Sequence, residues 1–135
     1  MKKNIWLFIF LSVFFVACKK QAKTLTGDWQ LTNTYVNGSL QPTSDTCMIF
    51  TVNRNKDQFF LKRYSCSTNA SISVASGEWE LTNKKRTIKM NFLQSSVPNP
   101  QNSGIWNWDI KELSEDNLTV EYSSFNKIKY EFKKL

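Results

Sequence analysis

Residues 127–133 read Lys-Ile-Lys-Tyr-Glu-Phe-Lys. Here Ile128, Tyr130 and Phe132 alternate strictly with charged residues, so an extended strand would place the three apolar side chains on one face. The same period of two recurs immediately upstream, in Leu-Thr-Val-Glu-Tyr at residues 118–122. This alternation is typical of antiparallel strands that are buried on one side and exposed to water on the other.

Working back towards the N-terminus, the pattern predicts eight strands separated mostly by short polar turns. They centre on residues 29–35, 48–52, 59–66, 72–81, 88–92, 106–111, 118–122 and 128–133. Asn37-Gly38 is a strong turn signal, and Gly77 is expected to mark a bulge or bend where the apolar parity changes. The sequence therefore predicts an all-β domain, an eight-stranded antiparallel up-and-down meander barrel, because closure removes exposed edges. A two-sheet sandwich has the same local pattern and stays open as an alternative.

One predicted connection is longer than a hairpin needs. Residues 94–103 contain Pro98 and Pro100 among Ser, Asn and Gln, with no apolar period. The stretch is either a lid over a barrel mouth or an ordinary surface loop, and the composition favours the surface loop.

The N-terminus has the layout of a secretory signal. Lys2 and Lys3 precede an apolar run over residues 5–16, which is shorter than the roughly 20 residues that a bilayer-spanning helix needs. The run ends in Phe-Val-Ala-Cys, which resembles the lipobox of bacterial lipoproteins with Phe15 in place of the usual leucine. A plain cleaved signal peptide is the main alternative.

The lipobox resemblance implies a division of the chain into three parts. Residues 1–17 would be a signal peptide, Cys18 would carry lipid (palmitate among its acyl chains), and residues 18–24 would form a lipidated tether before a barrel domain at residues 25–135. Each buried methylene contributes about 0.8 kcal/mol, so the two or three chains of such a cysteine anchor stably. We therefore expect a membrane-anchored protein of the bacterial cell envelope, at the outer membrane or cell surface rather than at the inner membrane.

The charge of the chain does not indicate a nucleic-acid partner. The formal net charge is +7. It falls to about +5 once Lys2 and Lys3 leave with the signal, and to about +2 for the folded part once Lys19, Lys20 and Lys23 are assigned to the tether. This excess is too small for the basic surface of a nucleic-acid-binding domain.

Two cysteines remain beside Cys18. Cys47 and Cys66 flank the predicted hairpin at residues 55–58, and a register centred there would set them across from each other. Because exported chains meet an oxidising compartment, we expect a disulfide, which contributes about 3 kcal/mol in the chain-entropy model. Two thiols in a chain without histidine are a poor metal site, so neither a metal nor a cofactor is expected.

The sequence does not indicate an enzyme. It lacks histidine, a glycine-rich phosphate loop and a Ser-x-x-Lys nucleophile pattern. Its aromatic residues either line a ligand cavity or fill the core, since an eight-stranded barrel has room for only one of these. The candidates for ligand contact are Trp29, Trp79, Trp106, Trp108, Tyr122 and Tyr130.

Short motifs connect the chain to a known family. Gly27-Asp28-Trp29 resembles the glycine-x-tryptophan signature that opens the first lipocalin strand, and Gly77-Glu78-Trp79 echoes it. Residues 106–118 resemble the late strands of lipocalin-like lipoproteins of Bacteroidetes. The last strand has Lys133 and Lys134 where true lipocalins place an arginine.

Two functions follow from these expectations. The resemblance implies an extracytoplasmic barrel that holds a small molecule, so we expect a membrane-anchored lipoprotein that binds a small apolar or amphipathic ligand. The alternative is a barrel with a filled core, whose outer surface binds a protein or a glycan. Inhibition of an attacking hydrolase belongs to this second class of function. No particular protein partner is indicated.

Overall fold

The computed structural model describes residues 20–53, 57–95 and 104–135. They form the strands β1 (Gly27–Val36), β2 (Ser39–Leu40), β3 (Thr46–Asn53), β4 (Gln58–Ser65), β5 (Ser71–Thr82), β6 (Thr87–Ser95), β7 (Ile105–Leu113), β8 (Asn117–Ser123) and β9 (Lys127–Lys134). Each of the eight predicted strands is present, and the all-β class is confirmed. The sequence did not predict β2, a two-residue strand that follows the Asn37-Gly38 turn.

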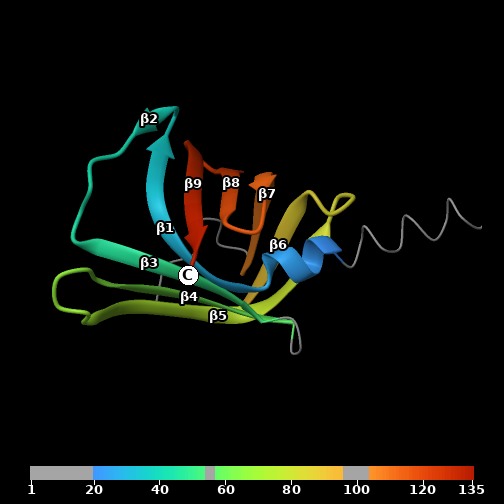
Figure 1. Ribbon diagram of the computed structural model, residues 1–135, viewed down its shortest axis with the longest axis horizontal. Helices are drawn as coiled ribbons and strands as arrows, with labels where there is room; N and C mark the ends of the chain where they lie inside the picture. The colour runs from blue at the N-terminus through green and yellow to red at the C-terminus, as the bar shows by residue number, and fades with distance from the viewer. Residues whose placement is uncertain (1–19, 54–56, 96–103) are drawn as a thin grey trace, which may run out of the picture.

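The strands form a closed antiparallel barrel. From β3 to β9 each strand pairs with the next along the chain, and β1 pairs with both β3 and β9. Since β2 pairs only with the end of β1, the ring itself has eight strands. In Figure 1, β3, β4 and β5 run together along one side of the barrel, with β7, β8 and β9 across from them. The closure of β1 on β9 confirms the barrel and excludes the sandwich.

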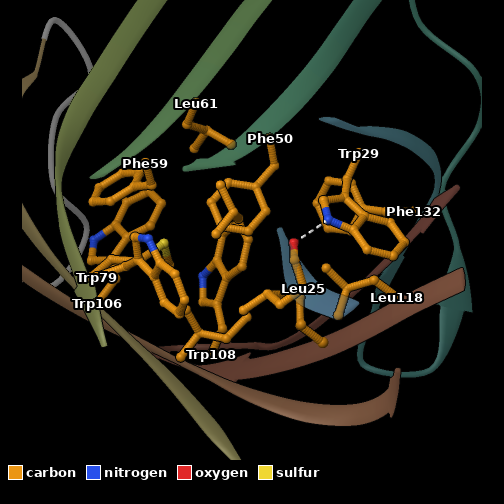
Figure 2. Packing of buried hydrophobic residues seen from close by; sticks show 14 of the residues in the cluster. Leu25, Trp29, Phe50, Phe59, Leu61, Trp79, Trp106, Trp108, Leu118 and Phe132 are labelled. Carbon is orange, nitrogen blue, oxygen red and sulfur yellow. Dashed lines mark hydrogen bonds between the residues drawn. The ribbon is translucent and has the colours of Figure 1, made fainter. Parts of the chain in front are cut away.

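The barrel interior is packed with apolar side chains. Figure 2 shows the large aromatic residues of the core pointing toward one another from opposite walls. The ring centroids of Phe50 and Trp108 lie 5.2 Å apart, and those of Phe92 and Trp106 lie 4.6 Å apart in an edge-on arrangement. The buried residues of this core are Leu25, Trp29, Met48, Phe50, Val52, Phe59, Leu61, Ala75, Trp79, Ile88, Met90, Trp106, Trp108, Leu118, Val120 and Phe132.

A bulge occurs beside Gly77, but the extra residue is Leu93 on the neighbouring strand β6, and the reason given for the bulge is wrong. The register of β5 against β6 shifts between Ser76 and Gly77. However, β5 keeps one parity throughout: Ala75 and Trp79 are buried, whereas Ile72 and Val74 lie on the outer wall and are about half exposed. At this shift the two strands approach closely, and glycine is needed because a Cβ atom on Gly77 would lie 1.9 Å from the carbonyl oxygen of Asn91.

A short helix at residues 20–25 lies at one end of the barrel (Figure 1). Leu25 is fully buried, and its carbonyl oxygen accepts a 2.7 Å hydrogen bond from Nε1 of Trp29. Lys134 Nζ donates to the carbonyl oxygen of Thr24 at 3.0 Å and sits 4.9 Å from the centre of the Trp29 ring. The segment assigned to a tether thus folds, from residue 20 onward, onto what we call the closed end. Along the described ranges, no helix is long and apolar enough to cross a membrane.

The predicted disulfide between Cys47 and Cys66 is present, with Cα atoms 5.2 Å apart. The expected register was wrong by two residues, because Cys47 pairs with Tyr64 rather than with Cys66. The hairpin instead pairs Asn53 with Gln58, so Cys66 falls just beyond the end of β4. The disulfide therefore joins β3 to the start of the β4–β5 connection, at the opposite end from the helix.

Candidate functional site

The end of the barrel opposite the helix contains a cavity of about 350 Å³. We call this the mouth cavity. Its walls come from inward-facing residues near one end of β1, β3, β4, β7, β8 and β9, and from the segment before β3. The residues that line it are Leu31, Thr34, Ser44, Thr46, Met48, Leu61, Arg63, Trp106, Trp108, Tyr122 and Tyr130. A volume of this size lies at the lower end of the range for small-molecule sites.

Four of the six predicted ligand contacts meet in this cavity. Trp106 and Tyr122 stack with ring centroids 6.1 Å apart, and Trp108 and Tyr130 lie 5.6 Å apart. The two tyrosine hydroxyl oxygens approach within 3.5 Å. Adjacent strands bring these rings together. Trp106 and Trp108 share the inner face of β7. On β8, Tyr122 lies two residues after Val120, which is the cross-strand partner of Tyr130 on β9. The result is an aromatic wall with polar tips.

The other two tryptophans lie near the closed end. Nε1 of Trp29 is bonded to Leu25, as described above, and Nε1 of Trp79 donates to the carbonyl oxygen of Asn53 at 3.1 Å. Neither residue lines the mouth cavity. In the described part of the chain, both indole N–H groups are used to join neighbouring segments of the barrel.

Sequence reasoning missed seven of the residues that line the mouth cavity, and Arg63 is the charged one among them. On β4, Phe59 and Leu61 are buried on the inner face, whereas Phe60 and Lys62 are exposed on the outer face. Arg63 continues the inner parity and lines the cavity as a half-buried side chain. The signal was available in the sequence: a charged residue at the apolar phase of an alternating strand is unusual and marks a functional candidate.

Polar atoms without partners gather at this end. Nε1 of Trp108 and Oγ of Ser73 are buried, and neither has a hydrogen-bond partner among the described residues. Ser73 is the direct cross-strand partner of Arg63. Burial, together with the neighbouring Tyr122, raises the pKa of Tyr130 far above its usual range, while the charge of Arg63 opposes this increase. Tyr130, like any tyrosine, is protonated at neutral pH, and its raised pKa keeps it so in more alkaline solution.

A cluster around Asp45 forms part of the rim. The Asp45 carboxylate accepts hydrogen bonds from the Ser65 hydroxyl at 2.5 Å and from the backbone N–H of Ser67 at 2.9 Å. These bonds, Ser65 first, lower the pKa of Asp45. They fasten the segment before β3 to the β4–β5 connection beside the disulfide, which fixes Ser44 and Thr46 on the wall of the mouth cavity.

Two other depressions differ in character. A more open one of about 640 Å³ runs beside β5 and β6, and its walls carry Glu78, Glu80, Lys85 and Lys89. A shallow one of about 320 Å³ lies on the outer wall between Phe60 and Leu93. Neither has the enclosed aromatic wall of the mouth cavity. No group of three or more potential metal ligands occurs among the residues that the structure describes.

Two predicted features lie outside the described residues. Cys18, the predicted lipidation site, precedes the first described residue, Lys20. The proline-containing connection is described only at its ends, since residues 96–103 are not covered. Both features stay predictions.

A closed antiparallel meander with a helix across one end and a cavity at the other is the architecture of a lipocalin-like protein. Residues 25–120 match the sequence profile of the lipocalin-like domain family. The chain belongs to this family, as its motifs suggested.

Two solved structures have the same fold. A lipocalin-like protein from Bacteroides uniformis ATCC 8492 is 19% identical, with a TM-score of 0.63 over 83% of this chain and 99% of the other. An uncharacterized protein from Bacteroides eggerthii DSM 20697 is 15% identical, with a TM-score of 0.60 over 82% of this chain and 98% of the other. No curated protein matches the chain. At these identities the likeness concerns the fold alone.

Proposed function

We propose that this protein is a lipoprotein of a bacterial envelope that binds a small apolar or amphipathic ligand at the open end of its barrel. The observation that carries the proposal is the mouth cavity, where Trp106, Trp108, Tyr122 and Tyr130 form one aromatic wall. Large apolar surfaces with a few polar groups at their edge are the usual lining of small-molecule sites. We propose binding alone, without a catalytic step.

The depth of the core limits where the ligand sits. Below the cavity, Phe50, Phe59 and Phe132 are fully buried and pack against one another or against Trp108. The helix then covers the far end with Leu25. A ligand would therefore enter and leave through the mouth, and would occupy only the upper part of the barrel.

The proposed anchor fits this arrangement. Lys20 begins the helix at the closed end, and two residues of chain span at most about 7 Å. An acylated Cys18 would consequently hold the closed end next to the bilayer, and the mouth would face away from it. In this orientation the ligand comes from the surrounding aqueous space rather than directly from the membrane interior.

The test is to identify what the protein carries. The full chain with a C-terminal affinity tag would be purified from the envelope of its native host, and its organic extract analysed by mass spectrometry. Thr46→Trp places a large side chain in the cavity wall, whereas Ile49→Trp changes the outer face of the same strand and serves as the matched control. We expect a reproducible small molecule with the wild type and the control, and its loss in the Thr46 variant. Equal amounts in both variants would contradict the proposal.

A specific observation also favours the alternative, a surface that binds a protein or a glycan. Phe60, Val74 and Leu93 are exposed on the outer wall of three adjacent strands, with exposed fractions of 42%, 43% and 65%. Contiguous apolar patches on an outer wall commonly mark interaction sites. If no extract contains a bound molecule, a Phe60→Ser variant that loses a copurifying partner would support this second function.

A further inference from the structure

The mouth cavity is lined by a charged side chain, Arg63, that forms no ion pair among the described residues. Arg63 lies on the inner face of β4, where it pairs with Met48 on β3 and Ser73 on β5. The ion pairs of the described residues all join lysine to glutamate on other parts of the barrel, and none includes Arg63. The Asp45 carboxylate on the rim accepts hydrogen bonds from Ser65 and Ser67 and forms no ion pair with Arg63 in the described part of the chain.

The remainder of the chain cannot supply the missing charge. Residues 1–19, 54–56 and 96–103 contain neither aspartate nor glutamate. These residues therefore bring no carboxylate to Arg63. A guanidinium held on the inner wall of a half-enclosed cavity is stabilised by an anion, and its planar donors suit carboxylate or phosphate oxygens.

Further donors lie at the same end of the barrel. The hydroxyl groups of Tyr122 and Tyr130 are 3.5 Å apart, and the buried Nε1 of Trp108 has no partner among the described residues. Oγ of Ser73, the cross-strand partner of Arg63, is also buried without a hydrogen-bond partner among the described residues. Of these groups, the two tyrosine hydroxyls belong to half-buried residues that line the cavity, so they can donate to an incoming oxygen.

We propose that the ligand is an amphipathic anion whose acidic oxygens bind Arg63 while its apolar body lies against the rings of Trp106, Tyr122 and Tyr130. This inference rests on the proposed function and specifies the chemistry of its ligand. A cavity of about 350 Å³ corresponds to roughly a dozen water molecules at their liquid volume. The apolar body is accordingly short, comparable to a medium-length alkyl chain.

Binding of decanoate, decanol and decyl phosphate tests the inference. The full-length lipoprotein would be placed in phospholipid nanodiscs, with empty nanodiscs as the blank, and binding followed by tryptophan fluorescence. Arg63→Met removes the inward charge, and Lys62→Met removes the adjacent outward charge as the matched control. We expect Arg63→Met to weaken decanoate binding about 10- to 100-fold and Lys62→Met to change it less than twofold. Decanol should bind more weakly than decanoate to the wild type and equally to the wild type and Arg63→Met.

The outcomes separate the two levels of the proposal. Equal binding of decanoate and decanol, unchanged in Arg63→Met, would overturn the acidic head group and leave a neutral ligand in the cavity. Absence of binding for all three probes would overturn the short amphipathic ligand, and the extract described above would then decide whether any ligand exists. Tighter binding of decyl phosphate than of decanoate would support the inference and assign the head group to phosphate; the reverse order would assign it to carboxylate.

Discussion

Replacement of Gly77 by alanine tests how closely two strands of the barrel approach each other. A Cβ atom at this position would lie 1.9 Å from the carbonyl oxygen and 2.9 Å from the carbonyl carbon of Asn91 on β6. Ordinary contact begins at 3.4 Å, so β5 and β6 would have to separate locally by about 1.5 Å. The obstacle is backbone rather than a flexible side chain, and the movement would break ladder hydrogen bonds beside the bulge.

Overpacking of a rigid site typically costs about 1–3 kcal/mol, and the hydrogen bonds lost beside it add to that cost. We therefore expect the free energy of unfolding of Gly77→Ala to fall by about 3 kcal/mol. Total stabilities of 5–15 kcal/mol are usual, so the variant should still fold. In urea the midpoint should fall by roughly 2 M with an unchanged slope.

Two control variants separate collision from other effects. Ser76→Ala alters the outward-facing neighbour and should change stability by less than about 0.5 kcal/mol. Gly38→Ala adds a methyl group where nothing lies within 4 Å but φ is +83°, so it should cost about 1 kcal/mol from backbone strain alone. Tryptophan fluorescence during urea unfolding would report all three variants. A Gly77→Ala protein as stable as Ser76→Ala would refute the packing argument.

Three further predictions concern the rim of the mouth and the anchor. Removal of the disulfide by Cys47→Ser with Cys66→Ser should reduce the free energy of unfolding by about 3 kcal/mol, given the separation of 19 residues, and thermal unfolding would measure it. Asp45→Asn should be less stable than the wild type at neutral pH. Because folding lowers the pKa of Asp45, the carboxylate contributes its full stabilisation at any pH well above its pKa in the unfolded chain. The difference in stability between the wild type and Asp45→Asn should shrink as the pH falls below 3.8. The same difference in urea midpoint between the two proteins at about pH 7 and at about pH 3 would contradict this prediction. Cys18→Ala should abolish incorporation of a labelled palmitate analogue. It should also abolish the release from membranes that lipase treatment causes in the wild type. Label retained in the variant would show another lipidation site.

The sequence alone predicted the strands well because their signal is local. Alternation over neighbouring residues depends only on which side of a strand faces water, and the eight predicted segments all became strands. Arg63 belongs to the same class of information. The structure places it on the inner face with Phe59 and Leu61, a position that follows from alternation once the face of Phe59 is known.

Local patterns could not decide the register of the β3–β4 hairpin. Phe59 and Phe60 are adjacent, so the apolar pattern was compatible with more than one alignment. The structure pairs Asn53 with Gln58 and places Cys66 beyond β4. The disulfide forms nonetheless, because its two Cα atoms lie within bridging distance diagonally across the hairpin end.

Alternation determined which side chains point inward, but only the tertiary structure decided at which end of the barrel each of them lies. All four tryptophans of the domain that were candidates lie on inner faces, yet Trp106 and Trp108 line the mouth while Trp29 and Trp79 bond to segments near the closed end. Their separation depends on the pairing of β1 with β9, about one hundred residues apart, and on the helix that covers one end only. Contacts at such sequence distances arise from the closure of the whole sheet, and no short-range period in the chain records them.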